Sequence, residues 1–194
     1  MKMTPMLRQY LELKDQAGSA LLLYRMGDFY ETFFEDAEVL ARTAGVTLTS
    51  RDKDSDHPVP LAGVPFHAID TYLARLLEDG LNVAICEQTE DPAAAKGLVQ
   101  REVVEIISPG TVTAPELVTA TSGNYCAAYI PAPGRSDAAG WALVDATTGE
   151  FRCGQEPVSL SSLVQELPVC AVIVPDDIDK EQTPPWRGAM PDLV

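Results

Sequence analysis

Tyr24-Arg25-Met26-Gly27-Asp28-Phe29-Tyr30-Glu31 is the stretch from which the fold of this chain can be worked out. The apolar run at 21–24 has the length of a buried strand, and Gly27-Asp28 is a turn signal. From Tyr30 onward, apolar residues recur at helical spacing as far as Ala44, and a glycine follows. The pattern therefore predicts a helix that begins after Asp28, with Asp28 as its N-cap and with Phe29 and Glu31 in its first turn.

Phe29 and Glu31 are the two residues of this expected first turn that the core does not need. On a helical wheel of about 100° per residue, Phe29 falls at the edge of the apolar stripe and Glu31 falls outside it. A purely structural interpretation is open, because Asp28 and Glu31 have the N-cap and N3 spacing of a capping box. The functional interpretation is that an aromatic ring and a carboxylate are left available to a ligand. Their two-residue spacing would let both reach one ligand only at an exposed helix start, where the helix dipole partly offsets the acid.

The charge of the chain restricts the ways in which it could bind nucleic acid. The 194 residues include 29 acids and 14 bases, which gives a formal net charge of −15. Proteins that grip DNA through its phosphates depend on clustered Lys and Arg. Composition therefore argues against a strong free-standing DNA binder, unless the contacts are few and apolar or the phosphate grip lies outside this chain.

The cysteines and the apolar runs indicate a cytoplasmic protein without a metal site. The four cysteines are scattered, with no Cys-x-x-Cys pair, and only two histidines are present, so reduced thiols are expected and a zinc site is not. The start of the chain lacks the apolar segment of a secretory signal, and no apolar run is long enough to cross a bilayer.

The order of the expected elements predicts an α/β fold with a mixed central sheet flanked by helices. In the first 115 residues a helix from Pro5 precedes the opening strand, and strands are expected at 46–49, 59–62, 82–88 and 101–108. Helices are expected at 67–80 and 91–95. Residues 116–123 have the composition of a linker. A second pattern, with strands at 125–130, 141–144, after Gly149 and at 170–174 and a helix at 159–167, predicts a second α/β segment over 124–194.

Several short motifs occur in an order that carries a specific resemblance. They are Thr4-Pro5-Met6 with Gln9-Tyr10, Phe29-Tyr30-Glu31, Ala62-Gly63-Val64-Pro65-Phe66-His67-Ala68, Ala84-Ile85-Cys86-Glu87-Gln88, Asp91-Pro92, Lys96-Gly97 and Pro109-Gly110-Thr111. This ordered set resembles the mismatch-recognition domain (domain I) of the MutS family of DNA mismatch repair proteins. A weaker likeness, carried by Asp145 and Thr148-Gly149-x-Phe151, extends to the start of the ribonuclease-H-like connector domain (domain II), which would be incomplete in this chain.

The resemblance implies a physical rather than a chemical function for Phe29 and Glu31. Phe29 would enter the minor groove as a wedge and stack on a mispaired base, and Glu31 would hydrogen-bond to that base. By position, Met26, Arg51, Gly63, Pro65 and His67 would lie on the DNA-facing edge. Three of these residues have a structural alternative: Met26 as core filler, Arg51 as a solvated loop charge and His67 as a helix cap.

The resemblance also implies partners and a cofactor, most of them outside this chain. Parent proteins of the family are homodimers that use Mg-ATP in a distant domain, whereas no P-loop pattern and no catalytic constellation occurs here. The expected partners are mismatched double-stranded DNA and, through the connector domain, a MutL-like repair protein. We expect the chain by itself to be monomeric, to bind DNA weakly, and to be cytoplasmic and associated with the nucleoid.

Two other functions remain open at this point. The first is a metal-dependent nuclease that uses acids such as Asp28, Glu31 and Glu87 at strand ends. The second is a protein-interaction module without DNA binding of its own, which suits the acidic composition and the second segment.

Overall fold

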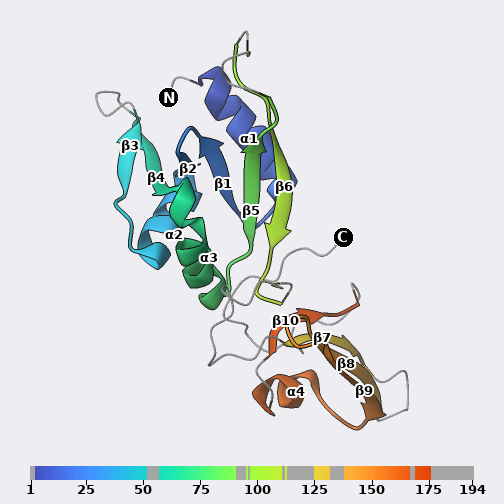
Figure 1. Ribbon diagram of the computed structural model, residues 1–194. Helices are drawn as coiled ribbons and strands as arrows, with labels where there is room; N and C mark the ends of the chain where they lie inside the picture. The colour runs from blue at the N-terminus through green and yellow to red at the C-terminus, as the bar shows by residue number, and fades with distance from the viewer. Residues whose placement is uncertain are drawn as a thin grey trace. The chain divides into compact units, whose positions relative to one another are not determined.

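The computed structural model describes residues 3–51, 57–90, 95, 97–110, 112, 125–131, 138–166 and 169–175. The chain divides into two compact units, Met1–Ile107 and Ser108–Val194, each with its own core (Figure 1). The predicted linker at 116–123 lies outside the described residues, so the exact domain boundaries stay a prediction.

The first unit is a mixed α/β domain, which confirms the predicted fold class. Its elements are α1 (Pro5–Ala17), β1 (Leu21–Met26), β2 (Phe29–Phe33), α2 (Phe34–Ala44), β3 (Thr49–Arg51), β4 (Val59–Pro65), the 3₁₀ turn η1 (Phe66–Ala68), α3 (Ile69–Glu78), β5 (Val83–Gln88) and β6 (Arg101–Ile107). The six strands form one sheet in the order β3-β4-β2-β1-β5-β6. Only the β1–β5 pair is parallel.

Helix α1 covers one face of this sheet, and α2 and α3 lie on the other (Figure 1). The Thr4 side chain caps α1 by accepting from the Leu7 N–H at 3.3 Å, and Pro5 occupies the first turn. The buried face of the helix packs on Leu22, Tyr24 and Phe33, which extend toward α1 from β1 and β2. The alternation of the strands therefore decides which residues this core contains.

The prediction that a helix begins at Phe29 is wrong over residues 29–33. Phe29–Phe33 is a central strand, antiparallel to both β1 and β4, and α2 begins only at Phe34. Gly27 and Asp28 form the two-residue connection of a hairpin, with φ +58° at Gly27 and no positive φ at Asp28. This is the pattern of a type II′ turn, which needs glycine at its first position. Asp28 is therefore a turn residue and not an N-cap.

Asp36 ties α2 to the sheet from the inside. Its carboxylate accepts from the Leu22 N–H at 2.9 Å and from the Tyr10 hydroxyl at 3.2 Å, and it lies 3.0 Å from the Lys14 ammonium. Only 9% of Asp36 is exposed. Burial is the main cause that raises the pKa of Tyr10, so the Tyr10 hydroxyl stays a donor.

Most of the other expected elements of the first unit are present. The strands at 59–62, 82–88 and 101–108 are confirmed as β4, β5 and β6, and the helix at 67–80 as α3 preceded by η1. The strand expected at 46–49 lies instead at Thr49–Arg51. The expected helix at 91–95 falls almost entirely outside the described residues.

The second unit contains β7 (Tyr125–Ile130), β8 (Ala139–Asp145), β9 (Glu150–Glu156), α4 (Leu160–Glu166) and β10 (Val169–Ile173). These strands form a four-stranded sheet in the order β10-β7-β8-β9, and Leu160 and Leu163 of α4 pack against one face of it. The elements expected in this region are thereby confirmed. In the described part of the chain, no helix combines the length and the apolar character that crossing a membrane requires.

Candidate nucleic-acid interface

Phe29 and Glu31 extend from the same face of β2. Side chains two residues apart on a strand point the same way, whereas two residues apart on a helix they diverge by about 200°. Phe29 and Glu31 therefore do not lie at an exposed helix start, as predicted from the sequence, but on a strand. The strand provides a simpler reason why an aromatic ring and a carboxylate could meet one ligand.

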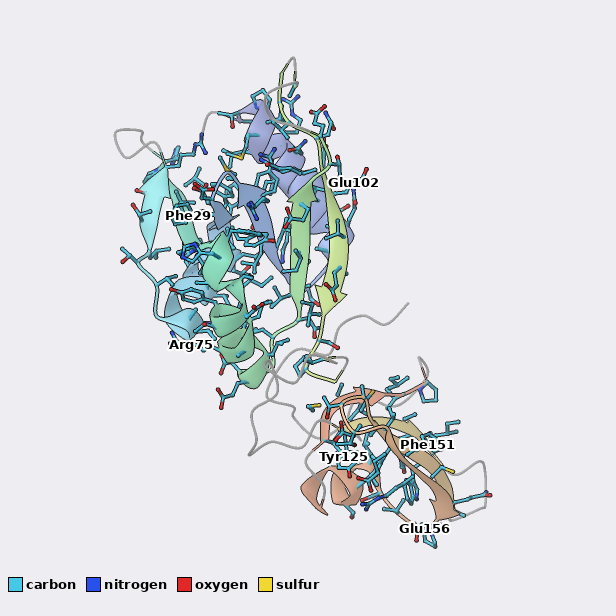
Figure 2. The ribbon with its side chains drawn as sticks, in the orientation of Figure 1. Phe29, Arg75, Glu102, Tyr125, Phe151 and Glu156 are labelled. Atoms are coloured by element: carbon cyan, nitrogen blue, oxygen red, sulfur yellow. The ribbon has the colours of Figure 1, made fainter. Side chains whose placement is uncertain are left out.

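The ring of Phe29 is not part of the core. Phe29 directly follows the hairpin turn and is 47% exposed, while its neighbour Tyr30, on the opposite face, is 4% exposed. Figure 2 labels Phe29 in the first unit. A large apolar side chain held at the tip of a hairpin is a feature that folding does not require.

The strand register brings three of the other sequence-predicted residues to the face of Phe29 and Glu31. Met26 and Pro65 are the partners of Phe29 on β1 and β4, and Gly63 is the β4 partner of Glu31. Directly paired residues of an antiparallel sheet share a face. Met26, Phe29 and Pro65 thus form one row across three strands, and Glu31 lies in the next row.

Arg51 belongs to the same face, because its partner on β4, Val59, alternates in phase with Gly63 and Pro65. His67 does not belong to this face row. It lies in η1, directly after β4, and is exposed.

Glu31 is a half-buried carboxylate. Burial raises its pKa, and the positive charge of Arg51 opposes that rise. Gly63 leaves the space that Glu31 occupies, since a Cβ at Gly63 would lie 3.0 Å from the Tyr30 carbonyl oxygen and 3.4 Å from the Glu31 Cγ. Arg51, and not a helix dipole, is therefore the group that offsets the charge of Glu31.

Arg101, which lies in β6, was not identified from the sequence. Its side chain links several segments of the first unit. Its guanidinium donates to the Arg25 carbonyl at 2.7 Å, to Gln9 Oε1 at 3.1 Å and to the Val99 carbonyl at 2.8 Å. It also lies 4.5 Å from the centre of the Tyr24 ring. The Gln9 motif and Arg101 are 92 residues apart in the chain, so only the fold reveals that they act together.

The nuclease alternative receives no support from the positions of its acids. Glu31 and Cys86 are both partners of Tyr24 and share its face, so the adjacent Glu87 extends from the other face of the sheet. Glu31 and Glu87 therefore cannot share a cation. Across the described ranges, no group of three or more His, Cys, Asp or Glu side chains is placed to hold a metal ion.

Comparisons with known proteins agree with one another about the family. A family model described as MutS domain I matches residues 4–116. The proteins similar to this chain include "DNA mismatch repair protein MutS" from Methanothrix thermoacetophila, which is 49% identical over 158 residues, or 81% of this chain and 18% of the relative. The proteins of the same name from Desulfosudis oleivorans and Solibacter usitatus are 51% and 43% identical, over 77% and 90% of this chain and 17% and 20% of their own length. The chain thus spans about a fifth of the curated relatives that it matches.

Proposed function

The chain belongs to the MutS family of DNA mismatch repair proteins, and we propose that its first unit recognises mismatched double-stranded DNA with the face that carries Phe29 and Glu31. The observation that carries this proposal is the exposed ring of Phe29 at the tip of a hairpin, on the same strand face as a half-buried carboxylate. The similar proteins are named DNA mismatch repair proteins, which supports the same substrate.

In this proposal, Phe29 enters the minor groove and stacks on one base of a weak pair. Separating a base step costs a few kcal/mol in a sound duplex and less at a mismatch, whose pairing is already poor. Stacking on an aromatic ring returns about 1–3 kcal/mol per base. The balance favours binding at a mismatch, so the ring tests how easily the duplex deforms and not its sequence.

Glu31 adds a polar contact to the displaced base. Its raised pKa makes the protonated form accessible at a higher pH than for a solvated glutamate, and a protonated carboxyl can donate as well as accept. Burial thereby gives Glu31 a way to bond to base atoms that accept. Met26, Pro65 and Gly63 would line the floor next to Phe29, while Arg51 and His67 would approach the backbone of the duplex.

The experiment that tests this proposal compares one mispaired duplex with its perfectly paired counterpart. Fluorescence anisotropy at low salt would measure both affinities for the wild type, Phe29→Ala and Phe151→Ala. Phe151 is a matched control because it is a 64% exposed phenylalanine of the second unit. We expect Phe29→Ala to lose a preference of about 5- to 150-fold, which corresponds to the stacking energy of about 1–3 kcal/mol. An unchanged preference in Phe29→Ala would refute the wedge.

The charge of the chain favours weak binding in this assay. With a net charge of −15, few phosphates can be neutralised, so protein concentrations in the micromolar range or above are needed. In parent proteins, we propose, other regions supply the remaining grip through homodimerisation and bind Mg-ATP, since no P-loop pattern occurs in these 194 residues. The protein would act in the cytoplasm, at the nucleoid.

A second candidate function, protein docking, concerns the second unit. Ile130, Val144, Phe151 and Ile173 are 39–64% exposed, and the register of β10, β7, β8 and β9 puts all four on the face opposite α4. Such apolar surface suits a protein partner, for which we propose a MutL-like repair protein. Loss of binding to that protein in Val144→Asp, with Phe29→Ala unaffected, would support this assignment.

A further inference from the structure

The face of the hairpin opposite Phe29 carries a compact cluster of Arg25, Tyr30, Phe66 and Glu87. Arg25 and Tyr30 are direct partners in the β1–β2 pair, so both extend away from the Phe29 face. Glu87 extends from β5 to this same side, one residue after the Tyr24–Cys86 pair. Phe66 is the first residue of η1. The cluster therefore joins three strands and the turn that follows β4.

Arg25 contacts every other member of the cluster. Its guanidinium carbon lies 3.5 Å from the centre of the Phe66 ring and 5.4 Å from that of Tyr30, and Nη1 is 3.9 Å from Glu87 Oε1. The Arg25 side chain is only 16% exposed. Stacking on a ring while donating sideways requires a planar group with several donors, which arginine has and lysine lacks.

The same cluster occupies both carbonyl groups of the hairpin turn. Arg25 Nε donates to the Gly27 carbonyl at 2.6 Å, and the Phe66 backbone N–H donates to the Asp28 carbonyl at 2.8 Å. Phe29 follows Asp28 directly, so these two hydrogen bonds hold the backbone immediately before the exposed ring. The turn is thus held at two consecutive points, by the Arg25 side chain from the face turned away from the exposed ring and by the backbone that follows β4.

Tyr30 completes the cluster by donating its hydroxyl to Glu87. Burial and the neighbouring Glu87 raise the pKa of Tyr30 to about 12, so this hydroxyl remains a donor at any physiological pH. Glu87 in turn stays close to the Arg25 guanidinium. Each member therefore limits the movement of another.

We infer that Arg25 is a positioning residue that holds the Gly27–Asp28 turn rigid, so that Phe29 is presented as a fixed wedge. This inference rests on the proposed function of Phe29. A wedge must resist the cost of separating a base step, about a few kcal/mol, and a loose hairpin tip would yield instead of the duplex. Fixing the turn in advance lets the stacking energy discriminate between a weak and a sound pair.

The test compares Arg25→Lys, which keeps the charge but loses the planar donors, with the wild-type chain. Arg42→Lys is the matched control, because Arg42 is an exposed arginine on α2. The first readout is amide hydrogen exchange in the free chain. We expect the Phe66 amide to exchange about tenfold faster or more in Arg25→Lys, because the turn that accepts from it loosens. The Leu21 amide, which donates to the Asn82 carbonyl at 2.9 Å, should not change.

The second readout is the ratio of affinities for a mispaired and a perfect duplex. In Arg25→Lys we expect this ratio to fall by about fivefold or more, with the affinity for the perfect duplex unchanged. If Arg25 had a merely structural role, Arg25→Lys would lower stability and both affinities together and leave their ratio unchanged.

Each result decides one part of the inference. An unchanged Phe66 exchange rate in Arg25→Lys would show that Arg25 does not hold the turn. Faster exchange with an intact mismatch ratio would show that Phe29 does not need the support. If the wild type and Phe29→Ala both lack any mismatch preference, the proposed function of Phe29 is refuted, and so is the contribution of Arg25 to mismatch recognition. The exchange data would still decide whether Arg25 holds the turn.

Discussion

Replacing Gly110 by alanine should destabilise the second unit selectively. Gly110 is buried, and a Cβ at this position would lie 2.5 Å from the Cβ of Ala171 and 3.4 Å from the Cβ of Cys126. Carbon atoms in contact prefer about 3.5–4.0 Å, so the segment and β10 must separate by about 1 Å or more. Neither neighbour can rotate away, because both contacting atoms are fixed to the backbone.

The expected cost is that of overpacking a core, about 1–3 kcal/mol. For a unit of this size each kcal/mol lowers the melting temperature by about 4–8 °C. The matched control is Gly140→Ala in β8 of the same unit, where, among the residues that the structure describes, the new Cβ would meet only the Ile130 Cβ at an ordinary 4.0 Å. Gly140→Ala should be neutral or slightly stabilising, since glycine within a strand costs about 0.5–1 kcal/mol relative to alanine.

Tryptophan fluorescence makes this measurement specific to one unit. Both tryptophans of the sequence belong to Ser108–Val194, and Trp141 packs against the core of that unit, so the change in its fluorescence reports on the unfolding of the unit. The double variant Gly110→Ala, Ala171→Gly returns the missing space and should recover part of the loss. A melting temperature of Gly110→Ala equal to that of Gly140→Ala, or no recovery in the double variant, would refute the packing argument.

Three further substitutions probe the first unit. Asp36→Ala removes the acceptor of two buried donors and the partner of Lys14, so urea unfolding should show that the free energy of unfolding falls by about 3–5 kcal/mol. The control is Glu35→Ala at the exposed neighbouring position, which should cost about 0.5 kcal/mol or less. Glu31→Gln should be more stable than the wild type at neutral pH. The folded-state pKa of Glu31 is raised, so the protonated form favours folding, and this contribution to stability is lost as the pH rises through the folded-state pKa. The melting temperatures of Glu31→Gln and the wild type should therefore converge at acid pH and separate at higher pH. A difference in melting temperature that does not vary with pH would contradict this prediction. Gly27→Ala places a side chain at φ +58° and should cost about 1–2 kcal/mol in chemical denaturation, and a wild-type midpoint would argue against the II′ turn.

The element types were largely predictable because most of them depend on local pattern. The helix at Ile69–Glu78 follows from apolar residues at helical spacing, and the strands at Val83–Gln88 and Arg101–Ile107 follow from short apolar runs between turn signals. The failure at Phe29–Phe33 has a specific cause. Tyr30 and Phe33 are three residues apart, which extends the stripe of α2 backward by coincidence, although they face opposite sides of the sheet.

Gly27-Asp28 is also a typical hairpin turn sequence, so the local sequence is compatible both with a hairpin and with Asp28 as a helix N-cap. The tertiary structure decides between them. Because β2 pairs with strands on both sides, its backbone N–H and C=O groups are hydrogen-bonded in the extended form. The local sequence around β2 cannot predict the pairing with β4, which begins 30 residues later in the chain.

The candidate site was predictable only in its individual residues. Phe29 and Glu31 were singled out as side chains that the core does not need, but their common face follows from strand geometry that the sequence analysis did not anticipate. The neighbours of Phe29 depend on register, which pairs it with Met26 and Pro65. The contacts of Arg25 with Phe66 and Glu87 join segments 41 and 62 residues further along the chain, so no short window contains them.

The strand geometry also reconciles an acidic protein with a DNA-reading role. The salt-dependent part of the affinity for DNA comes from phosphates that Lys and Arg neutralise. A chain with a net charge of −15 can contribute little of this affinity. In the proposed mechanism, discrimination between a weak and a sound base pair has a different source, because it would depend on the neutral ring of Phe29 and on how firmly the hairpin holds that ring. Glu31, the acid on the same strand face as the ring, is partly desolvated and opposed by Arg51, so the charge that it would present to a duplex is reduced. Specificity and affinity can therefore reside in different parts of a larger protein, with this unit contributing mainly the first.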